Sequence, residues 1–308
     1  MQNNSNLNDQ ENNNLKHIVV SIIGEPNSGK STLLNNILGQ KLSAVTHKAQ
    51  TTRNVINGIT IYNDTQIMFL DTPGIFEAKR SVDQFIVKEA WQTIKNADLV
   101  IVLFDINKEL PNEVKKVLSY LQKIEKDFLI AINKCDKLEF SEFAKNNIIK
   151  LEEEANNILK DDTKIFKISA LLNNFNHLLK YIEQNAKHTG WIHNEDEITT
   201  LPLKFLAQEI TREKIMLYAH DEIPYNIIVE TENFEQKNNE CKIHQVIKVI
   251  SQSHKKIILG KKGEKIKTIG QKARLELEQI YGYKVHLFLH IQVRPNFMKH
   301  DSVFDIKI

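Results

Sequence analysis

The sequence predicts two folded domains of different class: an α/β domain with a mainly parallel sheet covered by helices on both faces, followed by an α+β domain. The chain has 308 residues, which exceeds what one hydrophobic core usually organises. Its composition, 41% hydrophobic and 26% charged, is typical of folded proteins rather than of disordered or collagen-like chains. The pattern of apolar residues changes beyond Pro202, which predicts that a second domain begins there.

The first domain is predicted over residues 17–185, where short apolar runs alternate with helix-compatible segments. The nearly continuous apolar character of these runs is typical of strands that are buried on both faces of a parallel sheet. Helices are predicted between them, for example at 83–96 and 112–124, and a last helix ends near residue 183. The predicted strands are IVVSII, NVINGITIY, TQIMFLD, DLVIVLFD, DFLIAIN and TKIFKIS.

The second domain is predicted over residues 202–300 and has the order α–β–β–α–α–β. A helix at 203–219 precedes the strands YNIIVETEN and CKIHQVIKVIS, which are joined by the polar turn EQKNN. A short helix, the turn GKKG, a long helix at 264–281 and the strand KVHLFLHIQV complete the domain. This order predicts a separate α+β unit.

Three segments are predicted to lie outside the two domains. Residues 1–16 contain seven Asn and two Gln and too few apolar side chains to form a core, so they are predicted to be a disordered tail. The polar segment 186–201 is predicted to be a linker. Residues 301–308 are predicted to be a C-terminal tail.

Charge is divided unevenly along the chain. Residues 241–308 carry 14 Lys and Arg against 5 Asp and Glu, net +9, whereas residues 1–240 carry 27 against 34, net −7. A basic segment next to an acidic remainder indicates a module that binds a polyanion such as nucleic acid. A run of charge is, however, more often only a solvated face, and the charge alone leaves both interpretations open.

The sequence predicts a cytoplasmic protein with reduced cysteines. Its N-terminus has neither the basic start nor the apolar core of a secretory signal. The longest apolar stretch, at 99–104, is far shorter than the ~20 residues that span a bilayer. Cys135 and Cys241 are too few for a disulfide framework, so both thiols are expected to be free.

A phosphate-binding loop is predicted between the first strand and the helix that follows it. The segment GEPNSGKS matches the pattern G-x-x-x-x-G-K-[ST] in the required strand–loop–helix context. Its glycines let backbone N–H groups turn toward phosphates, Lys30 reaches the β- and γ-phosphates, and Ser31 ligates Mg²⁺. The residues of this candidate site are Gly24, Glu25, Pro26, Asn27, Ser28, Gly29, Lys30, Ser31 and Thr32.

Three further motifs follow later strands. DTPG places Asp71 at the end of a buried strand, where a carboxylate can hold Mg²⁺ through water. In NKCD, the Asp136 carboxylate can accept from the N1–H and the amine of guanine, which adenine does not offer, and Cys135 is more typical of a space-filling residue. Because ligands bind at the carboxyl ends of strands in open parallel sheets, these motifs are expected to meet. They contribute Asp71, Thr72, Pro73, Gly74, Ile75, Asn133, Lys134, Cys135, Asp136, Ser169 and Ala170.

Together these motifs resemble the Era family of bacterial ribosome-assembly GTPases, notably in the stretch KAQTTR at 48–53. The second domain resembles a type II KH domain, whose G-x-x-G loop clamps a single-stranded RNA backbone. The resemblance covers roughly residues 17–298. It implies a P-loop GTPase domain that is followed by an RNA-binding KH domain.

The resemblance also implies cofactors and partners. Mg²⁺ is expected at Ser31, Asp71 and a switch I hydroxyl, which is Thr52 in preference to Thr51. The implied partners are GTP, GDP, the 3′ end of small-subunit (16S) ribosomal RNA and the 30S subunit, whose maturation the protein would assist. A monomer is expected. The family is also described at the cytoplasmic face of the inner membrane, for which we find no anchor in the sequence.

The G-x-x-G loop is the candidate RNA site. Its glycines leave room for a phosphodiester against the loop backbone, and its two lysines add positive charge. Ile258, Ile266 and Ile269 are expected to form an apolar groove floor, although at least one of them is expected to belong to the core instead. The candidate RNA-binding residues are Ile258, Gly260, Lys261, Lys262, Gly263, Lys265, Ile266 and Lys267.

The hydrolytic machinery departs from a common pattern at Ile75. Many GTPases have a Gln after D-x-x-G that orients the attacking water, and because Ile cannot form hydrogen bonds, slow intrinsic hydrolysis is predicted unless another group substitutes. Asn27 is a candidate, since some relatives with Asn at this position place K⁺ beside the phosphates, but Asn27 could equally satisfy only local backbone. The candidate catalytic residues are Lys30, Thr52, Gly74 and Asn27.

Two other functions are alternatives to a GTP-hydrolysing switch. A passive RNA-binding chaperone would not need an intact nucleotide site, whose residues are Lys30, Ser31, Asp71, Asn133 and Asp136. A tRNA-modification GTPase would need a catalytic appendage, commonly with a C-terminal cysteine, whereas Cys241 lies in the middle of the second domain. The motifs therefore favour the switch.

Overall fold

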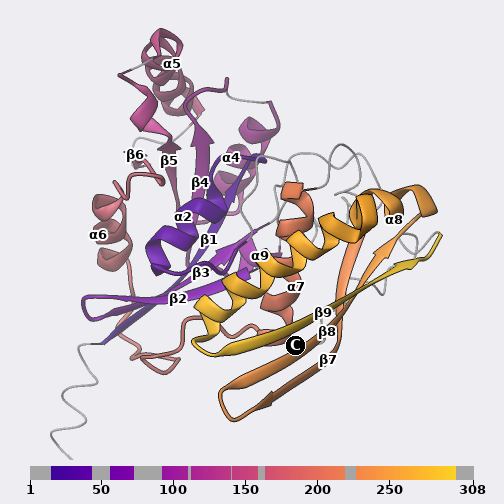
Figure 1. Cartoon of the computed structure of the whole chain (residues 1–308). Helices are drawn as coiled ribbons and strands as arrows, with labels where there is room; N and C mark the ends of the chain where they lie inside the picture. The colour runs from indigo at the N-terminus through magenta and orange to yellow at the C-terminus, as the bar shows by residue number, and fades with distance from the viewer. Residues whose placement is uncertain are drawn as a thin grey trace, which may run out of the picture. The chain divides into compact units, whose positions relative to one another are not determined.

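The computed structural model describes residues 15–43, 56–72, 92–109, 112–139, 141–158, 164–218 and 227–295 (Figure 1). The predicted tail at 301–308, residues 1–14 of the predicted N-terminal tail and most of the predicted helix at 83–96 lie outside these ranges. The N-terminal tail was predicted to extend through residue 16, but Lys16 already belongs to the first strand of the sheet, where it pairs with Thr65. The chain divides between Thr200 and Leu201 into two compact units. Within the described ranges, no helix is long and apolar enough to cross a membrane.

The first unit is built on a six-stranded, mainly parallel sheet. Its strands are β1 (Lys16–Gly24), β2 (Ile56–Tyr62), β3 (Thr65–Asp71), β4 (Leu99–Asp105), β5 (Phe128–Asn133) and β6 (Ile165–Lys167). They lie in the order β2-β3-β1-β4-β5-β6, with β2 antiparallel to β3 and all other neighbours parallel. Every residue of β4 is buried, as expected of a central strand covered on both faces. The predicted α/β class is confirmed.

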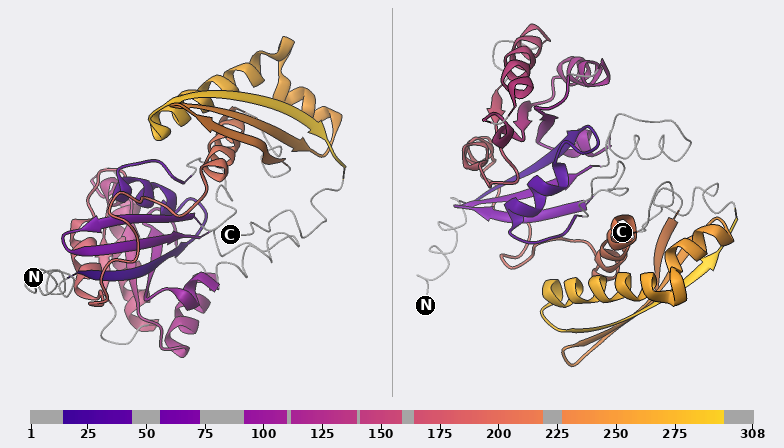
Figure 2. Two further views of the ribbon diagram at one scale, coloured as in Figure 1. Left: turned by 90° about the horizontal axis from the view of Figure 1, so that it is seen from below. Right: turned by 45° about the horizontal axis from the view of Figure 1, so that its top comes forward.

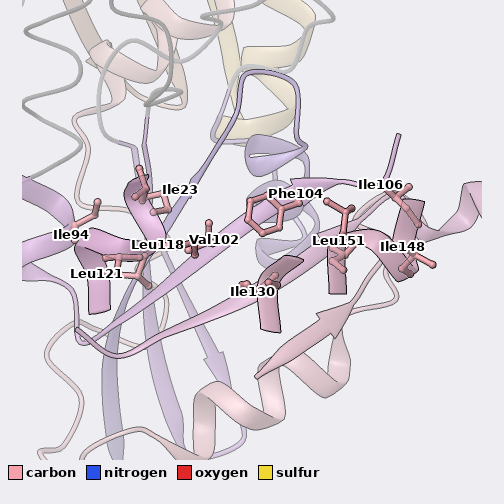
Figure 3. Close-up of a cluster of buried hydrophobic side chains, with 14 of the residues drawn as sticks. Ile23, Ile94, Val102, Phe104, Ile106, Leu118, Leu121, Ile130, Ile148 and Leu151 are labelled. Atoms are coloured by element: carbon pink, nitrogen blue, oxygen red, sulfur yellow. The ribbon is translucent and has the colours of Figure 1, made fainter. Parts of the chain in front are cut away.

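Helices flank this sheet (Figures 1 and 2). They are α2 (Lys30–Leu38), α4 (Asn112–Lys123), α5 (Glu142–Ile158) and α6 (Asn176–Gln184). Apolar side chains of the strands and the helices are buried against one another. Figure 3 shows the core cluster in which Ile23, Val102 and Ile130 of the central strands meet Leu118 of α4 and Leu151 of α5. Complete burial of one such side chain stabilises the fold by about 1.5–3 kcal/mol, so this core fixes the strands that lead to the site.

The segment predicted as a linker, 186–201, is hydrogen-bonded to the strands of the first unit. Gln66 of β3 is completely buried, and its side chain accepts from the N–H of His193 and donates to the carbonyl of His193, both at 2.9 Å. On β2, the N–H of Ile59 donates to the carbonyl of Ile198 at 2.8 Å. The first compact unit accordingly includes this segment as far as residue 200, and the segment is packed rather than a free connection.

The second unit has the predicted α–β–β–α–α–β order, which is confirmed. Its elements are α7 (Leu203–Tyr218), β7 (Ile227–Lys237), β8 (Glu240–Val249), α8 (Gln252–Leu259), a 3-10 turn (Lys261–Gly263), α9 (Glu264–Tyr281) and β9 (Lys284–Val293). The sheet order is β7-β8-β9, with β7 antiparallel and β9 parallel to β8. Ile215 of α7, Ile247 of β8 and Ile269 of α9 share one core cluster, and α9 lies along the sheet (Figure 2).

The turn between β7 and β8 is shorter than predicted. The polar run EQKNN was expected to form it, but β7 continues through Lys237 and only Asn238 and Asn239 turn the chain, with φ of 44° and 58°. Asn adopts this left-handed conformation more readily than most residues. The last residues of β7 are exposed and polar. Polarity is also typical of turns, so it could not distinguish the exposed end of the strand from a turn.

Candidate nucleotide site and basic loop

The structure brings the predicted motifs of the nucleotide site to one edge of the first sheet. β1 ends at Gly24, β3 at Asp71 and β5 at Asn133, and the carboxyl ends of parallel strands lie at the same edge. Asn133 also connects the motifs, because its Nδ2 donates to the Ser28 carbonyl at 2.8 Å and its Oδ1 accepts from the Ala170 N–H at 2.9 Å. One buried amide thus joins the phosphate-binding loop, NKCD and the Ser169-Ala170 pair.

Both glycines of the phosphate-binding loop are required by close contacts within the protein. A Cβ atom at Gly24 would lie 2.4 Å from the Leu103 carbonyl oxygen of β4. Gly29 has a φ of 103°, which favours glycine, and a Cβ atom there would lie 2.2 Å from Asn133 Nδ2. Packing within the protein is therefore a second reason for these glycines, beside the approach of a phosphate that the sequence predicts.

Lys30 lies under the loop, with its ammonium group turned toward loop carbonyls. Its Nζ donates to the carbonyls of Gly24 at 3.0 Å and Glu25 at 2.8 Å, and the side chain is only 6% exposed. Burial lowers the pKa of Lys30 to about 8, and the charges of Asp71 and Glu25 partly oppose this shift. A buried cation hydrogen-bonded to neutral carbonyls is suited to receive an anionic phosphate.

We predict that GDP binding takes up a proton at pH 8.5. With a pKa of about 8, much of Lys30 is neutral at this pH in the free protein, whereas a bound phosphate favours the ammonium form. As pH rises through the pKa, affinity should therefore fall, by at most about tenfold per pH unit. Calorimetric titrations in two buffers with different ionisation enthalpies measure the uptake. Lys30→Arg, which stays charged, is the control and should show no such uptake. Equal binding enthalpies in both buffers for the parent protein would contradict the prediction.

The same pKa shift has a consequence for folding. Between pH 8 and 10.5 the unfolded chain binds more protons at Lys30 than the folded chain does. Burial of Lys30 therefore lowers the free energy of unfolding below pH 8. This loss of stability becomes smaller as pH rises from 8 to 10.5. The folded protein maintains this cost at the position where a phosphate charge would offset it.

Asp71 and Ser31 form a candidate cation site. Ser31 Oγ donates to Asp71 Oδ2 at 2.8 Å, while Asp71 Oδ1 is buried and has no hydrogen-bond partner within the described part of the chain. Burial raises the pKa of Asp71, and the nearby Lys30 ammonium opposes the shift. Carboxylate and hydroxyl oxygens are ligands that suit Mg²⁺. The residues present therefore fit this ion.

Several predicted site residues lie outside the described residues. They are Thr51, Thr52, Pro73, Gly74 and Ile75, together with the stretch KAQTTR at 48–53. Their roles as switch, cation-binding or catalytic residues stay predictions. Thr72 is described, and its hydroxyl donates to the Ile22 carbonyl at 2.8 Å, so its side chain fastens the end of β3 to β1.

The NKCD motif is oriented by contacts on both sides. Ser169 Oγ donates to Asp136 Oδ1 at 2.7 Å, which holds the carboxylate predicted to contact the base. Lys134, with a φ of 67°, donates to the Asn27 carbonyl at 2.9 Å and forms an ion pair with Asp105 at 2.6 Å. The lysine thus braces the phosphate-binding loop from β5, while the carboxylate of Asp136 is positioned independently.

Cys135 is the third residue of the NKCD motif. Its Sγ donates to the Ile132 carbonyl at 3.3 Å, and the side chain packs against the core of the first unit. Burial raises the pKa of this thiol to about 11, so it is neutral at physiological pH and suited to filling space. Both cysteines are free, as predicted.

Sequence reasoning missed four residues of the site, namely Asn35, Ser43, Asp105 and Lys108. Ser43 Oγ donates to Asp71 Oδ2 at 2.6 Å, and Lys108 Nζ lies 3.7 Å from Glu25 Oε2. Asp105 could have been found, because it ends β4 at the same sheet edge as the motifs. The other three lie in segments whose sequences match no motif, so only their contacts identify them.

The loop GKKG in the second unit has one packed glycine and one open glycine. Gly260 has a φ of 72°, and a Cβ atom there would lie 2.6 Å from Lys265 Cβ. Gly263 has a φ of 81°, but a Cβ atom would meet nothing within 4 Å. Lys261 and Lys262 are exposed between them. The space beside Gly263 is therefore open to a ligand and flanked by positive charge.

The apolar residues beside this loop require a correction. Ile258, which was predicted to contact RNA, is completely buried in the core of the second unit together with Ile269. A side chain without exposed surface cannot contact RNA in this conformation, so both are core residues. Ile266 is partly buried against the same core, and among the three isoleucines it is the one that can still contribute to a groove floor. Lys265 is partly exposed and Lys267 is exposed.

Comparison with known proteins covers both units. Residues 19–134 match the family described as 50S ribosome-binding GTPase, and residues 222–296 match the KH domain family. The chain is 44% identical over 281 residues to GTPase Era of Rickettsia bellii, which covers 91% of this chain and 93% of that protein. It is 41% identical over 279 residues to GTPase Era of Mesorhizobium japonicum, which covers 90% and 88%.

Two solved structures of Era match this fold with a TM-score of 0.86 each, covering 94% of this chain and 97% of the other. One is a variant of Aquifex aeolicus Era bound to GDP and AlF₄⁻, 35% identical to this chain. The other, 36% identical, is Era in complex with MgGDPNP and nucleotides 1506–1542 of 16S ribosomal RNA. These matches extend over the nucleotide site and the basic loop alike, and the chain belongs to the Era family of GTPases.

Proposed function

We propose that the chain is a GTP-driven switch that binds 16S ribosomal RNA near its 3′ end and assists maturation of the 30S subunit. The observation that carries the proposal is the hydrogen bond from the half-buried Ser31 to the buried carboxylate of Asp71, at the same sheet edge as Lys30 and Asp136. Within the described residues, the other oxygen of this carboxylate has no hydrogen-bond partner. A domain that had lost nucleotide binding would have no reason to maintain such a costly arrangement of buried charge.

The phosphates are bound by the loop and by the start of α2. Lys30 exchanges its two carbonyl partners for phosphate oxygens, and the charge-assisted bonds are stronger than those they replace. The N-terminus of α2, which begins at Lys30, would add its free backbone N–H groups to the phosphate site. Ser31 and Asp71 would hold Mg²⁺, which when bound supplies positive charge against the triphosphate.

The base is selected by Asp136. Its carboxylate would accept two hydrogen bonds from the guanine edge, while Ser169 keeps the group oriented at 2.7 Å. Asn133 holds the loop against the base-binding motifs through Ser28. The parts of the site that bind the base and the phosphates would therefore be joined by hydrogen bonds within the protein.

The side chain of Ile75 has no donor or acceptor, so another group must orient the attacking water. Which group does so stays a prediction. Asn27 has a φ of 64°, and its carbonyl accepts from Lys134, so its backbone has a structural task beside any role toward K⁺. The role of K⁺, the monomeric state, the cytoplasmic location and any contact with the inner membrane also remain predictions.

The RNA part of the proposal is supported by the basic loop and by one relative. The space at Gly263 is open, Lys261 and Lys262 are exposed beside it, and Era has been solved with nucleotides 1506–1542 of 16S ribosomal RNA. A phosphodiester at Gly263 would lie against the loop and the N-terminus of α9, which begins at Glu264. Binding should therefore depend on this loop.

Replacing Lys261 and Lys262 together by Glu tests the RNA site. The double variant places two negative charges where the RNA backbone is proposed to lie, so affinity for a 3′-terminal 16S fragment should fall at least tenfold, which is ~1.4 kcal/mol. The salt dependence of binding should become shallower as phosphate contacts are lost. Basal GTP hydrolysis should stay within about twofold, because the nucleotide site has its own core. Fluorescence anisotropy at several salt concentrations, with phosphate release in parallel, measures these effects.

The matched control is the double variant Lys237→Glu and Lys242→Glu, which changes the charge by the same amount on the exposed β7–β8 hairpin. If this control weakens RNA binding as much as the loop variant does, GKKG contributes to RNA binding only through net charge. The proposed RNA site would then be wrong. Undiminished binding by the loop variant leads to the same conclusion. Absence of GTP hydrolysis by the parent protein, with RNA or without it, would instead contradict the switch.

A further inference from the structure

We propose that Ser43 is a positioning residue that holds the Asp71 carboxylate toward its cation, and that Asn35 in turn holds Ser43. The inference rests on the proposed function, because it assigns a role toward Mg²⁺ at the Ser31–Asp71 site. The three residues come from α2, from the segment that follows it and from the end of β3, and no motif of the nucleotide site includes Asn35 or Ser43.

The two carboxylate oxygens of Asp71 have different surroundings. Its Oδ2 accepts two hydroxyl hydrogen bonds, from Ser31 at 2.8 Å and from Ser43 at 2.6 Å. Its Oδ1 is buried without a hydrogen-bond partner in the described part of the chain. Two donors on one oxygen restrict rotation of the carboxylate and keep the other oxygen available. Ser31 is also expected to ligate the cation, whereas the hydroxyl of Ser43 has only the orienting task.

Ser43 is itself held by one side chain. Asn35 Oδ1 accepts from the N–H groups of Leu42 and Ser43, both at 2.9 Å, and Asn35 Nδ2 donates to the Ser43 carbonyl at 2.8 Å. Leu42 and Ser43 are almost completely buried. All three bonds of this amide go to two consecutive residues, which is the arrangement expected when the position of a buried backbone segment matters.

This arrangement connects the cation site to the next functional segment in the sequence. Ser43 directly precedes the stretch that contains the predicted switch residues Thr51 and Thr52. Asn35 therefore fixes Ser43, the residue before that stretch, at the carboxylate expected to hold the cation. Loss of the Ser43 hydroxyl should leave the nucleotide site folded but weaken its response to Mg²⁺.

The test is the affinity of the full chain for a fluorescent GDP analogue, measured while Mg²⁺ is titrated. For Ser43→Ala, the Mg²⁺ concentration at half-maximal effect should rise at least fivefold, whereas affinity in EDTA stays within twofold of the parent. Ser43→Thr retains a hydroxyl and should restore at least half of the loss. Asn35→Ala should resemble Ser43→Ala, and the double variant should be no weaker than Ser43→Ala, because Asn35 acts through Ser43.

Ser21→Ala is the matched control. Its hydroxyl is completely buried in β1 and has no hydrogen-bond partner within the described ranges, so its removal deletes a buried hydroxyl without touching Asp71. It should leave the Mg²⁺ response unchanged. Circular dichroism establishes that each variant is folded, and if Ser43→Ala is not, Asn35→Ala provides the measurement.

The outcomes separate this inference from the proposed function through Ser31→Ala. If Ser31→Ala removes the Mg²⁺ response and Ser43→Ala does not shift it, the cation site stands and the role of Ser43 is wrong. If neither variant alters the response, the proposed cation site itself is wrong. Equal losses for Ser43→Ala with Mg²⁺ and in EDTA would make Ser43 merely structural, and failure of Ser43→Thr to restore the response would likewise overturn the inference.

Discussion

Lys30→Ala should weaken GTP binding by about 3–5 kcal/mol, the cost typical of removing one partner of a buried charge pair, and should abolish measurable hydrolysis. In the free protein the Lys30 ammonium is buried against two loop carbonyls, so the energetic cost of burying it is already present before a nucleotide arrives. Removing it takes away the charge-assisted contacts to the transferring phosphate. Equilibrium binding of a fluorescent GTP analogue and single-turnover hydrolysis measure the two effects.

Lys108→Ala is the matched control for this variant. Lys108 also contacts the phosphate-binding loop, since its Nζ donates to the Pro26 carbonyl at 3.2 Å, but its side chain is 43% exposed. Exposed ion pairs contribute at most about 1 kcal/mol, so GTP affinity should change by less than about fivefold. A turnover rate for Lys30→Ala within twofold of the parent, or equal losses in the two variants, would rule out a special role of Lys30.

Asp136→Asn should exchange the base preference from guanine to xanthine. The parent carboxylate can accept from both N1–H and the exocyclic amine, whereas an amide presents one acceptor and one donor. Its donor would face the amine of guanine but the 2-carbonyl of xanthine. A mismatched, unpaired polar group in a binding site costs about 1–3 kcal/mol, so GTP should bind roughly 10- to 100-fold more weakly and xanthosine triphosphate more tightly by a similar factor. Competition binding with both nucleotides measures the exchange.

Ser169→Ala distinguishes orientation of the carboxylate from its chemistry. This variant removes the 2.7 Å hydrogen bond that orients Asp136 but leaves the carboxylate in place. It should weaken GTP modestly without improving xanthosine triphosphate. Unchanged preference in Asp136→Asn would refute the assignment of NKCD as the base-binding motif, whereas a preference switch in Ser169→Ala would show that geometry alone selects the base.

The sequence by itself determined those features that depend only on residues close together in the chain. The long helix at 264–281 and the strand at 284–293 were predicted with the bounds that the structure has, because apolar periodicity and glycine turns are local signals. The phosphate-binding loop and NKCD were equally visible, since each motif places its chemistry within a few residues and directly after a strand. The rule that ligands bind at the carboxyl ends of parallel strands then predicted that they meet.

Tertiary structure alone decided the contacts that join these parts. Asn133 was predicted for the base, but its hydrogen bonds to Ser28 and Ala170 depend on how three segments pack. Packing also decided that Ile258 belongs to the core and that residues 186–200 are bonded to the first sheet, because an apolar or polar residue has the same local pattern whichever neighbour covers it. The position of Ser43 beside Asp71, 28 residues apart in sequence, follows from the same cause. Such contacts arise from the folded arrangement of distant segments, for which the local sequence carries no signal.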